Sequence, residues 1–357
     1  MPDNATLRRE FLRTAGAAAF TASWFTGGLK GANQKVRLGF IGAGGMGSAN
    51  IACAARVPGF EIAAVCDVYQ PALDGAAAQA GKLGFEGVQA AKDFRALLAD
   101  KSIDALCISA PEGWRASMAV EACRAGKDVW VEAPVCAYVE EGPRMVEAAR
   151  QYGRVAQAGA VGRSDDVFRK AREVVKSGEL GEIGFCRAFD DRLSGPGVHL
   201  LDMLQWAFDE AMPVSISAQG APPYATLATL RYPGFVASYE SRATNARGAG
   251  HGVSFHGSKA TLMVDRAGCF LYPNGGNAKP VEERGRMAGS RTAHWRNFLE
   301  CIRSRRRPVG DIETCVRATT TCLLSDLALR HGATLDWDEK AFTVRRSDTK
   351  RHLKMEV

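Results

Sequence analysis

The sequence predicts an α/β fold in which an N-terminal domain with a parallel sheet precedes an α/β domain with an open, mostly antiparallel sheet. Apolar strands alternate with helices from Val36 to Val131, and a glycine-rich turn follows the first strand. After Gly153 the pattern changes to closely spaced strand-like segments. We expect a leader and linker (1–34), a first domain (35–153), an open-sheet domain (154–292) and C-terminal helices that pack back on the core, with a tail (293–357).

The leader has the pattern of an export signal. Arg8-Arg9 begins a twin-arginine motif, and the small, apolar stretch 15–25 is too short to cross a bilayer as an ordinary helix. An amphipathic surface helix is the alternative, but this stretch shows no polar face. We expect export through the twin-arginine pathway to the periplasm. Because no clear cleavage site precedes Val36, a retained membrane anchor stays open.

The composition is that of a globular protein that binds small molecules. The chain has 357 residues, of which 46% are hydrophobic and 24% charged, and a formal net charge of +7. This modest charge comes without interleaved aromatic residues and argues against a nucleic-acid partner. The ten cysteines show no paired spacing and most lie in apolar runs, so we expect buried free thiols. There is no CxxC motif or His/Cys cluster, and we expect no metal site.

The first domain reads as repeated strand–helix units. Val36–Ile41 is a strand, 42–47 a turn, 48–56 a helix and 61–66 a second strand. Parallel strands joined by helices imply right-handed crossovers. The unit then repeats as a helix at 93–99, a strand at 105–109, a helix at 115–125 that ends at Gly126, and a strand at 129–131.

The second domain reads as a sheet interrupted by helices. One face of this sheet is expected to be polar or covered by a partner. The stretch 274–293 is glycine-rich and charged, which predicts a mobile loop. The expected strands are 184–189, 214–218, 226–231, 236–241 and 252–255, and the expected helices are 167–176, 198–208, 294–304 and 313–328.

The turn after the first strand matches a dinucleotide-binding fingerprint. The run Gly42-Ala43-Gly44-Gly45-Met46-Gly47 fits GxGxxG, follows an apolar strand, opens a helix and is followed twenty residues later by Asp67. The glycines allow close backbone approach, and the helix N-terminus attracts a diphosphate. The Asp67 carboxylate accepts ribose hydroxyls and repels a 2′-phosphate, and Val68 and Tyr69 supply no arginine. This pattern favours NAD or NADH over NADP.

From Val36 to about Trp337 the sequence resembles the Gfo/Idh/MocA family of oxidoreductases. The resemblance implies a Rossmann domain, then an open-sheet domain that often forms the oligomer contact, and hydride transfer between NAD(P) and a sugar or related alcohol. With the twin-arginine motif it is similar to the exported, sugar-acting branch. The matching segments, in order, are the fingerprint with Asp67, Ala110-Pro111-Glu112-Gly113-Trp114-Arg115, residues 126–134 (GKDVWVEAP), Gln157-Ala158-Gly159, residues 177–181 (SGELG), residues 197–202 (GVHLLD), residues 256–260 (HGSKA) and residues 294–298 (HWRNF).

The resemblance also implies which residues meet the cofactor. Besides the fingerprint, Asp67 and Val68, residues at the ends of the expected strands 105–109 and 129–131 are expected to contact the cofactor. Glu132 is expected to bond the backbone near the nicotinamide, and Lys127 is expected to be solvated. The further cofactor-binding candidates are Ser109, Ala110, Pro111, Trp114, Glu132 and Ala133.

Two catalytic positions depart from the family. Ala133 stands where the family normally has the lysine of Glu-Lys-Pro, and Gly195 stands where it has an aspartate four residues before its histidine, here His199. The family's Asp-His-Trp-His run is represented by residues 112–115 (EGWR), and the connection 189–197 is short, which suggests a trimmed substrate wall. Hydride transfer from an alcohol needs a base for the hydroxyl proton and a group that stabilises the developing alkoxide.

The remaining candidates keep several functions open. His199 is either a general base or a residue packed under the nicotinamide, and Asp202 either orients its imidazole or holds the fold. Arg115 or Arg192 can replace the missing cation, but an arginine cannot act as base. We therefore expect a pseudo-oxidoreductase that keeps NAD(H) tightly bound and binds a small molecule or carbohydrate. The alternatives are an active oxidoreductase, or an NAD-assisted lyase or glycosidase, acting on a sugar derivative; a dimer or tetramer through the second sheet is also expected.

Overall fold

The computed structural model describes residues 34–190, 197–221, 225–242, 250–265, 267–275, 282–284 and 290–349. The twin-arginine segment and the predicted positions Arg192 and Gly195 lie outside these residues. None of the described helices is long and apolar enough to cross a membrane.

The first domain is built on a six-stranded parallel sheet with strand order β3-β2-β1-β4-β5-β6. This order reverses between β1 and β4, and ligands of such sheets bind at that point, outside the carboxyl ends of the strands. The strands β1, β4 and β5 are almost wholly buried, because helices cover both faces. The strands are β1 (Val36–Ile41), β2 (Phe60–Cys66), β3 (Gln89–Ala91), β4 (Ala105–Ile108), β5 (Asp128–Val131) and β6 (Ala156–Ala158).

Helices connect these strands in the order expected of a Rossmann domain. They are α2 (Gly45–Ala54), α3 (Gln70–Lys82), α4 (Phe94–Ala99), α5 (Glu112–Arg124) and α6 (Glu141–Gln151). Asp93 caps α4, since its carboxylate accepts the backbone N–H of Arg95. The sequence analysis places the end of the first domain at residue 153, but the first sheet continues past it through β6.

The second sheet has ten strands in the order β14-β13-β12-β11-β7-β10-β9-β8-β15-β16. All its described pairings are antiparallel except β7 with β10. The strands are β7 (Ile183–Asp190), β8 (Ser215–Ala221), β9 (Ala225–Arg231), β10 (Val236–Arg242), β11 (His251–Gly257), β12 (Ala260–Asp265), β13 (Cys269–Pro273), β14 (Glu282–Arg284), β15 (Leu335–Asp338) and β16 (Thr343–Arg346).

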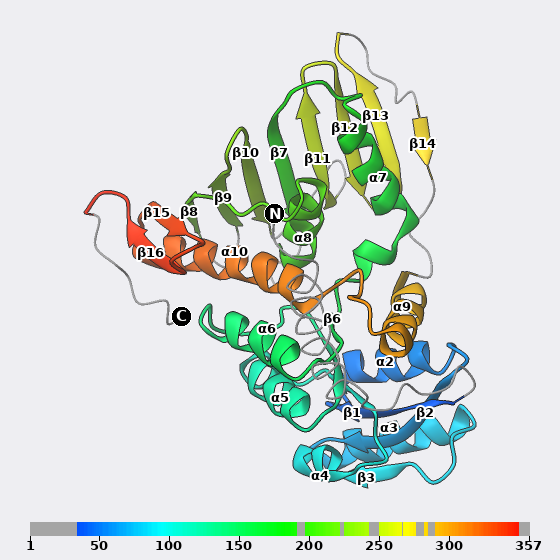
Figure 1. Cartoon of the computed structure of the whole chain (residues 1–357). Coiled ribbons are helices and arrows are strands. Elements are labelled where there is room, and N and C mark those ends of the chain that lie inside the picture. Colours follow the sequence, from blue (N-terminus) through cyan, green and yellow to red (C-terminus); the bar gives the residue numbers. More distant parts are fainter. Residues whose placement is uncertain are drawn as a thin grey trace, which may run out of the picture.

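Helices cover one face of this second sheet. Burial alternates along β9 and β12, as in a sheet with one covered face. Figure 1 shows α10 running between the two sheets and α9 lying beside α2. The remaining helices are η1 (Val161–Ser164), α7 (Asp166–Ser177), α8 (Gly197–Ala207), α9 (Ser290–Ser304) and α10 (Ile312–His331).

The C-terminal helices join the two domains through apolar contacts. Trp295 and Phe298 of α9 pack into the core of the first domain, where Trp295 stacks on Trp130 of β5 with ring centroids 4.1 Å apart. Leu324 and Leu327 of α10 pack into the core under the second sheet. The C-terminal helices therefore contribute apolar side chains to the cores of both domains.

The structure confirms the predicted α/β fold and corrects some details. The stretch 274–293 is not all loop, since β14 and the first turn of α9 fall inside it. Lys127 is buried instead of solvated, and its ammonium donates to the carbonyls of Asp100 and Ile103. Each of the ten cysteines is free and most are buried, as expected.

Candidate functional site

The fingerprint turn requires glycine at two places. Gly42 has φ +87°, and a Cβ there would lie 2.7 Å from the carbonyl carbon and oxygen of Ser109. A Cβ on Gly47 would lie 1.9 Å from the carbonyl oxygen of Gly42. The first turn of α2 is thereby held tightly against the ends of β1 and β4.

The N-terminus of α2 is suited to an anion. The helix begins at Gly45, three residues earlier than predicted, so its first N–H groups belong to the fingerprint itself. Gly44 provides no side-chain cap, and the first turn has no acidic residue. A Cβ on Gly44 or Gly45 would meet no atom within 4 Å, so there is open space beside these backbone groups. Uncapped N–H groups, the helix dipole and this space together fit a diphosphate.

A pocket of about 450 Å³ adjoins the turn at the ends of β1, β2 and β4. Val68 and Trp114 in its wall are 84% and 58% exposed, unusually high for large apolar side chains and consistent with contact to a ligand. Predicted residues in the lining are Gly42, Asp67, Val68, Ala110, Pro111 and Trp114, and residues that the prediction missed include Lys92, Phe94, Arg95 and Met118. The size and the apolar walls fit the adenosine half of a dinucleotide.

Asp67 lies between this pocket and the turn. Its carboxylate accepts the backbone N–H of Ala43 at 2.7 Å and that of Tyr69 at 2.9 Å. The carboxylate is thus held in place at the end of β2, where a ribose would lie. Lys92 and Arg95 bring positive charge into the same pocket, and Arg95 is paired with Asp93 at 3.3 Å.

Glu132 lies on the other side of the turn, at the end of β5, and is almost fully buried. One carboxylate oxygen accepts from Asn50 Nδ2 at 2.8 Å, from Trp130 Nε1 at 2.9 Å and from Arg291 Nη1 at 3.3 Å. The expected bond from Glu132 to the backbone is therefore wrong, because these partners are side chains. Asn50 Nδ2 also donates to Ser109 Oγ at 3.2 Å, which connects the network to the end of β4.

Ala133 follows Glu132 and offers only a methyl group at the position where the resembled family is expected to have a lysine. The neighbouring cation, Arg115, donates to the carbonyls of Ala110 and Pro134 and so ties the ends of β4 and β5 together. Burial lowers the pKa of Arg115, but an arginine stays charged in proteins. Arg115 therefore holds the backbone at the ends of β4 and β5 in place.

His199 lies in the first turn of α8 and is partly buried. Burial lowers its pKa, and the positive charges of Arg291 and His251 lower it further, whereas Glu132 and Asp202 act in the opposite direction. The imidazole is therefore neutral near pH 7 and able to accept a proton.

A row of polar side chains crosses the second sheet beneath α8. Ser241 of β10 and His251 of β11 both lie opposite Asp190 of β7 in register. His251 Nδ1 is 3.4 Å from a carboxylate oxygen of Asp190, which is fully buried. Tyr239, two residues before Ser241, shares this face, and its hydroxyl would lie 2.6 Å from a Cβ on Gly197. The row thus faces the first turn of α8, which carries His199.

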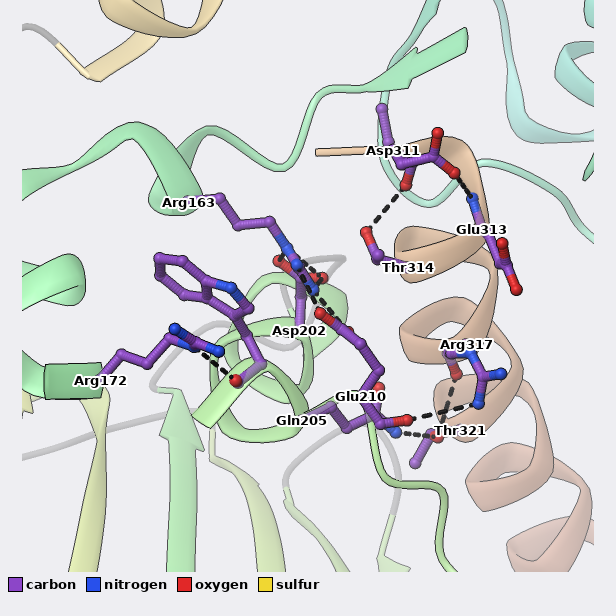
Figure 2. A network of polar contacts seen from close by, with 12 residues as sticks. Arg163, Arg172, Asp202, Gln205, Glu210, Asp311, Glu313, Thr314, Arg317 and Thr321 are labelled. Carbon is purple, nitrogen blue, oxygen red and sulfur yellow. Dashed lines mark hydrogen bonds and ion pairs between the residues drawn. The ribbon is translucent and has the colours of Figure 1, made fainter. Parts of the chain in front are cut away.

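Asp202 belongs to a separate ionic network, drawn in Figure 2. Its carboxylate accepts three hydrogen bonds of 2.7–3.0 Å from Arg163, and Glu210 accepts two more from the same guanidinium. Side chains of Arg163 and Asp202 are 2% and 1% exposed. The two readings of Asp202 are thereby resolved, since its hydrogen-bond partner is Arg163 of η1 and it influences His199 only by its charge.

The structure brings together part of the predicted site and adds residues to it. Ala43, Met46 and the fingerprint glycines lie beside Asp67, Ser109 and Ala110, and Glu132 approaches them through Asn50. The sequence prediction missed Asn50, Asp190, Tyr239, His251 and Arg291, which are far apart in the chain. Among the described residues, no group of three or more His, Cys, Asp or Glu side chains is arranged to hold a metal ion.

Comparison with known proteins finds relatives over parts of the chain. Residues 36–160 match the model of the oxidoreductase family Gfo/Idh/MocA, NAD-binding Rossmann fold. The uncharacterized oxidoreductase YrbE of Bacillus subtilis is 26% identical over 66% of this chain and 75% of its own length. Inositol 2-dehydrogenase 2 of Saccharopolyspora erythraea is 31% identical over 48% of this chain and 53% of its own. A glycosyl hydrolase family 109 protein of Shewanella sp. is 36% identical over 32% of this chain and 26% of its own.

Solved structures share the fold over most of the chain. A levoglucosan dehydrogenase in complex with NADH and levoglucosan aligns with a TM-score of 0.73 at 16% identity, over 85% of this chain and 99% of its own. The myo-inositol 2-dehydrogenase of Lactobacillus plantarum aligns with a TM-score of 0.70 at 19% identity and the same coverage. The sequence match thus spans about half of the inositol dehydrogenase of Saccharopolyspora erythraea and a quarter of the glycosyl hydrolase. The fold match, in contrast, spans 99% of each of the two solved structures. Residues 36–160 of this chain are thus similar to the Gfo/Idh/MocA family of oxidoreductases and form an NAD-binding Rossmann domain.

Proposed function

We propose that this protein holds NAD(H) as a tightly bound, retained cofactor and has lost the lysine-dependent dehydrogenase activity of its family. The observation that carries this proposal is the combination of an intact dinucleotide cradle with a methyl group at Ala133. The cradle matches a family of NAD-binding domains. The cofactor supplies hydride-accepting or hydride-donating chemistry when bound, but an alanine can neither exchange a proton nor stabilise an alkoxide.

The role of Arg115 supports this proposal. Arg115 binds the backbone carbonyls of Ala110 and Pro134, next to Ala133 in the chain. As an arginine it does not exchange a proton near neutral pH. Loss of one such group typically costs about 10²–10³ in rate.

A second candidate function is an active oxidoreductase, or an NAD-assisted lyase or glycosidase, on a sugar derivative. The neutral His199 and the polar row with His251 favour it. In the oxidation, His199 would take the hydroxyl proton while the carbinol carbon transfers its hydride to oxidised NAD, which forms a ketone. The names of the relatives, an inositol dehydrogenase and a glycosyl hydrolase, fit this class of substrate.

We also propose where the protein is located, how it contacts a second copy and what ligand it binds. A twin-arginine signal would carry the folded chain out with its cofactor already loaded, because little free NAD is available outside the cell. The partly exposed Phe185, Leu227 and Val236 on strands of the second sheet suit contact with a second copy of the chain. We further propose a carbohydrate or other small molecule as the ligand of the cleft.

Turnover assays separate the two functions. The purified protein is incubated with NAD and a panel of cyclitols, sugars, keto-sugars and glycosides. Absorbance of NADH reports net oxidation, and release of the cleaved group reports a lyase or glycosidase, which regenerates its NAD. We expect no turnover. Turnover that disappears in His199→Gln would establish the second function and overturn the first. The double variant Ala133→Lys with Gly195→Asp tests what limits activity. New activity would show that these two positions are limiting. No new activity would show that the trimmed substrate wall is limiting.

A further inference from the structure

We propose that Arg291 binds the diphosphate of the retained dinucleotide. This inference rests on the proposed function, because it explains how the cofactor is retained. Arg291 is the second residue of α9 and lies in a stretch that the sequence indicated to be loop. Its side chain extends from α9 to α2 and β5.

The position of Arg291 is fixed by two contacts. Its Nη1 donates to Asn50 Oδ1 at 3.1 Å and to Glu132 Oε1 at 3.3 Å. Asn50 follows Gly47 by three residues on α2, so both lie on one face of the helix. Asn50 also binds Ser109, whose backbone touches Gly42. Arg291 is thus linked to the glycine turn through Asn50 and Ser109.

The guanidinium has donors left for an anion. Arginine carries five N–H groups in a planar fork that matches phosphate oxygens. Both contacts of Arg291 to the described residues are made by Nη1, and the side chain is 25% exposed. Asn50, which Arg291 contacts, belongs to α2, and the uncapped N-terminus of this helix favours an anion.

The charges around Arg291 support a ligand-binding role. Glu132 pairs with it at 3.3 Å, a long distance for a charge-assisted bond, so this pairing uses only part of its capacity. Burial lowers the pKa of His199, Arg291 lowers it further and Glu132 acts in the opposite direction; the charge of Arg291 also acts on Cys107 and His294. A simple structural cation would neutralise Glu132 alone, whereas a bound diphosphate would take up the remaining donors.

The test measures dinucleotide affinity rather than activity. The purified protein is stripped with charcoal, and NADH and ADP-ribose are titrated separately into wild type, Arg291→Gln, Arg291→Lys and Arg296→Gln. Arg296 is exposed on the same helix and is the matched control. Because hydrogen bonds to charged groups are involved, we expect Arg291→Gln to bind both ligands about 10- to 100-fold more weakly. Arg291→Lys should lose less, and Arg296→Gln should match wild type.

Two results would overturn the inference. One is unchanged NADH affinity in Arg291→Gln, even if its thermal stability falls, since that combination identifies a structural partner of Glu132. The other is weaker NADH binding with normal ADP-ribose binding, which would place Arg291 at the nicotinamide. Failure of the proposed function would be seen instead in wild type, as turnover or as purification without a dinucleotide.

Discussion

Replacing Asp202 by asparagine is predicted to destabilise the protein without removing its cofactor. In wild type, Asp202 accepts three hydrogen bonds from Arg163, and both side chains are almost completely buried. Asp202→Asn keeps the shape but leaves Arg163 with Glu210, which is 25% exposed. Breaking a buried ion pair typically costs 3–5 kcal/mol, and because Glu210 remains we expect about 3 kcal/mol. For a chain of 357 residues that corresponds to a fall in melting temperature of roughly 4 °C, since the entropy of unfolding is about 2.1 cal/mol/K per residue.

The assay is urea and thermal unfolding with NADH binding measured in parallel. Asp166→Asn is the control, because Asp166 pairs with Arg169 while its side chain is 95% exposed, and its loss should cost less than about 1 kcal/mol. Unchanged stability together with altered cofactor binding in Asp202→Asn would refute the structural role that we assign to Asp202.

Two further predictions concern pH and the glycine turn. His294 is buried and neutral, with Ser164 Oγ at its Nδ1 and the Ala158 carbonyl at its Nε2, and burial lowers its pKa from 6.5 to about 4. The contribution of neutral His294 to stability is complete above pH 6.5 and is lost, by about 3 kcal/mol, as the pH falls towards 4. Urea unfolding at pH 6.5 and pH 4 should show a smaller pH dependence of stability in His294→Gln than in wild type. An equal pH dependence in the two proteins would contradict this role of His294. Gly47→Ala should abolish NADH binding or folding, because its Cβ would overlap the Gly42 carbonyl. Gly45→Ala, in open space, should fold at least as stably as wild type, by circular dichroism.

Local patterns predicted the first domain well because its signals are close together in the chain. The glycine turn, the apolar strand before it and Asp67 lie within about thirty residues, and the structure places them side by side. The helices α3 and α6, in contrast, are not among the elements predicted from the sequence. Lys127 was assigned to solvent because lysine is rarely buried, yet two backbone carbonyls stabilise it.

The rest of the candidate site was harder to predict because its residues meet only through the tertiary fold. Arg291 contacts Glu132 across 159 positions of sequence and Asn50 across 241. Asp190 and His251 become neighbours through the pairing of β7 with β11. A single sequence contains no local pattern for such contacts.

Retention of NAD(H) is tested most directly by mass spectrometry of the supernatant after heat denaturation of the freshly purified protein. We predict NAD or NADH in an amount comparable to that of the protein chains. A supernatant without dinucleotide, from protein shown to be folded before heating, would contradict the proposal that the intact cradle at Gly42, Gly44 and Gly47 holds its cofactor tightly.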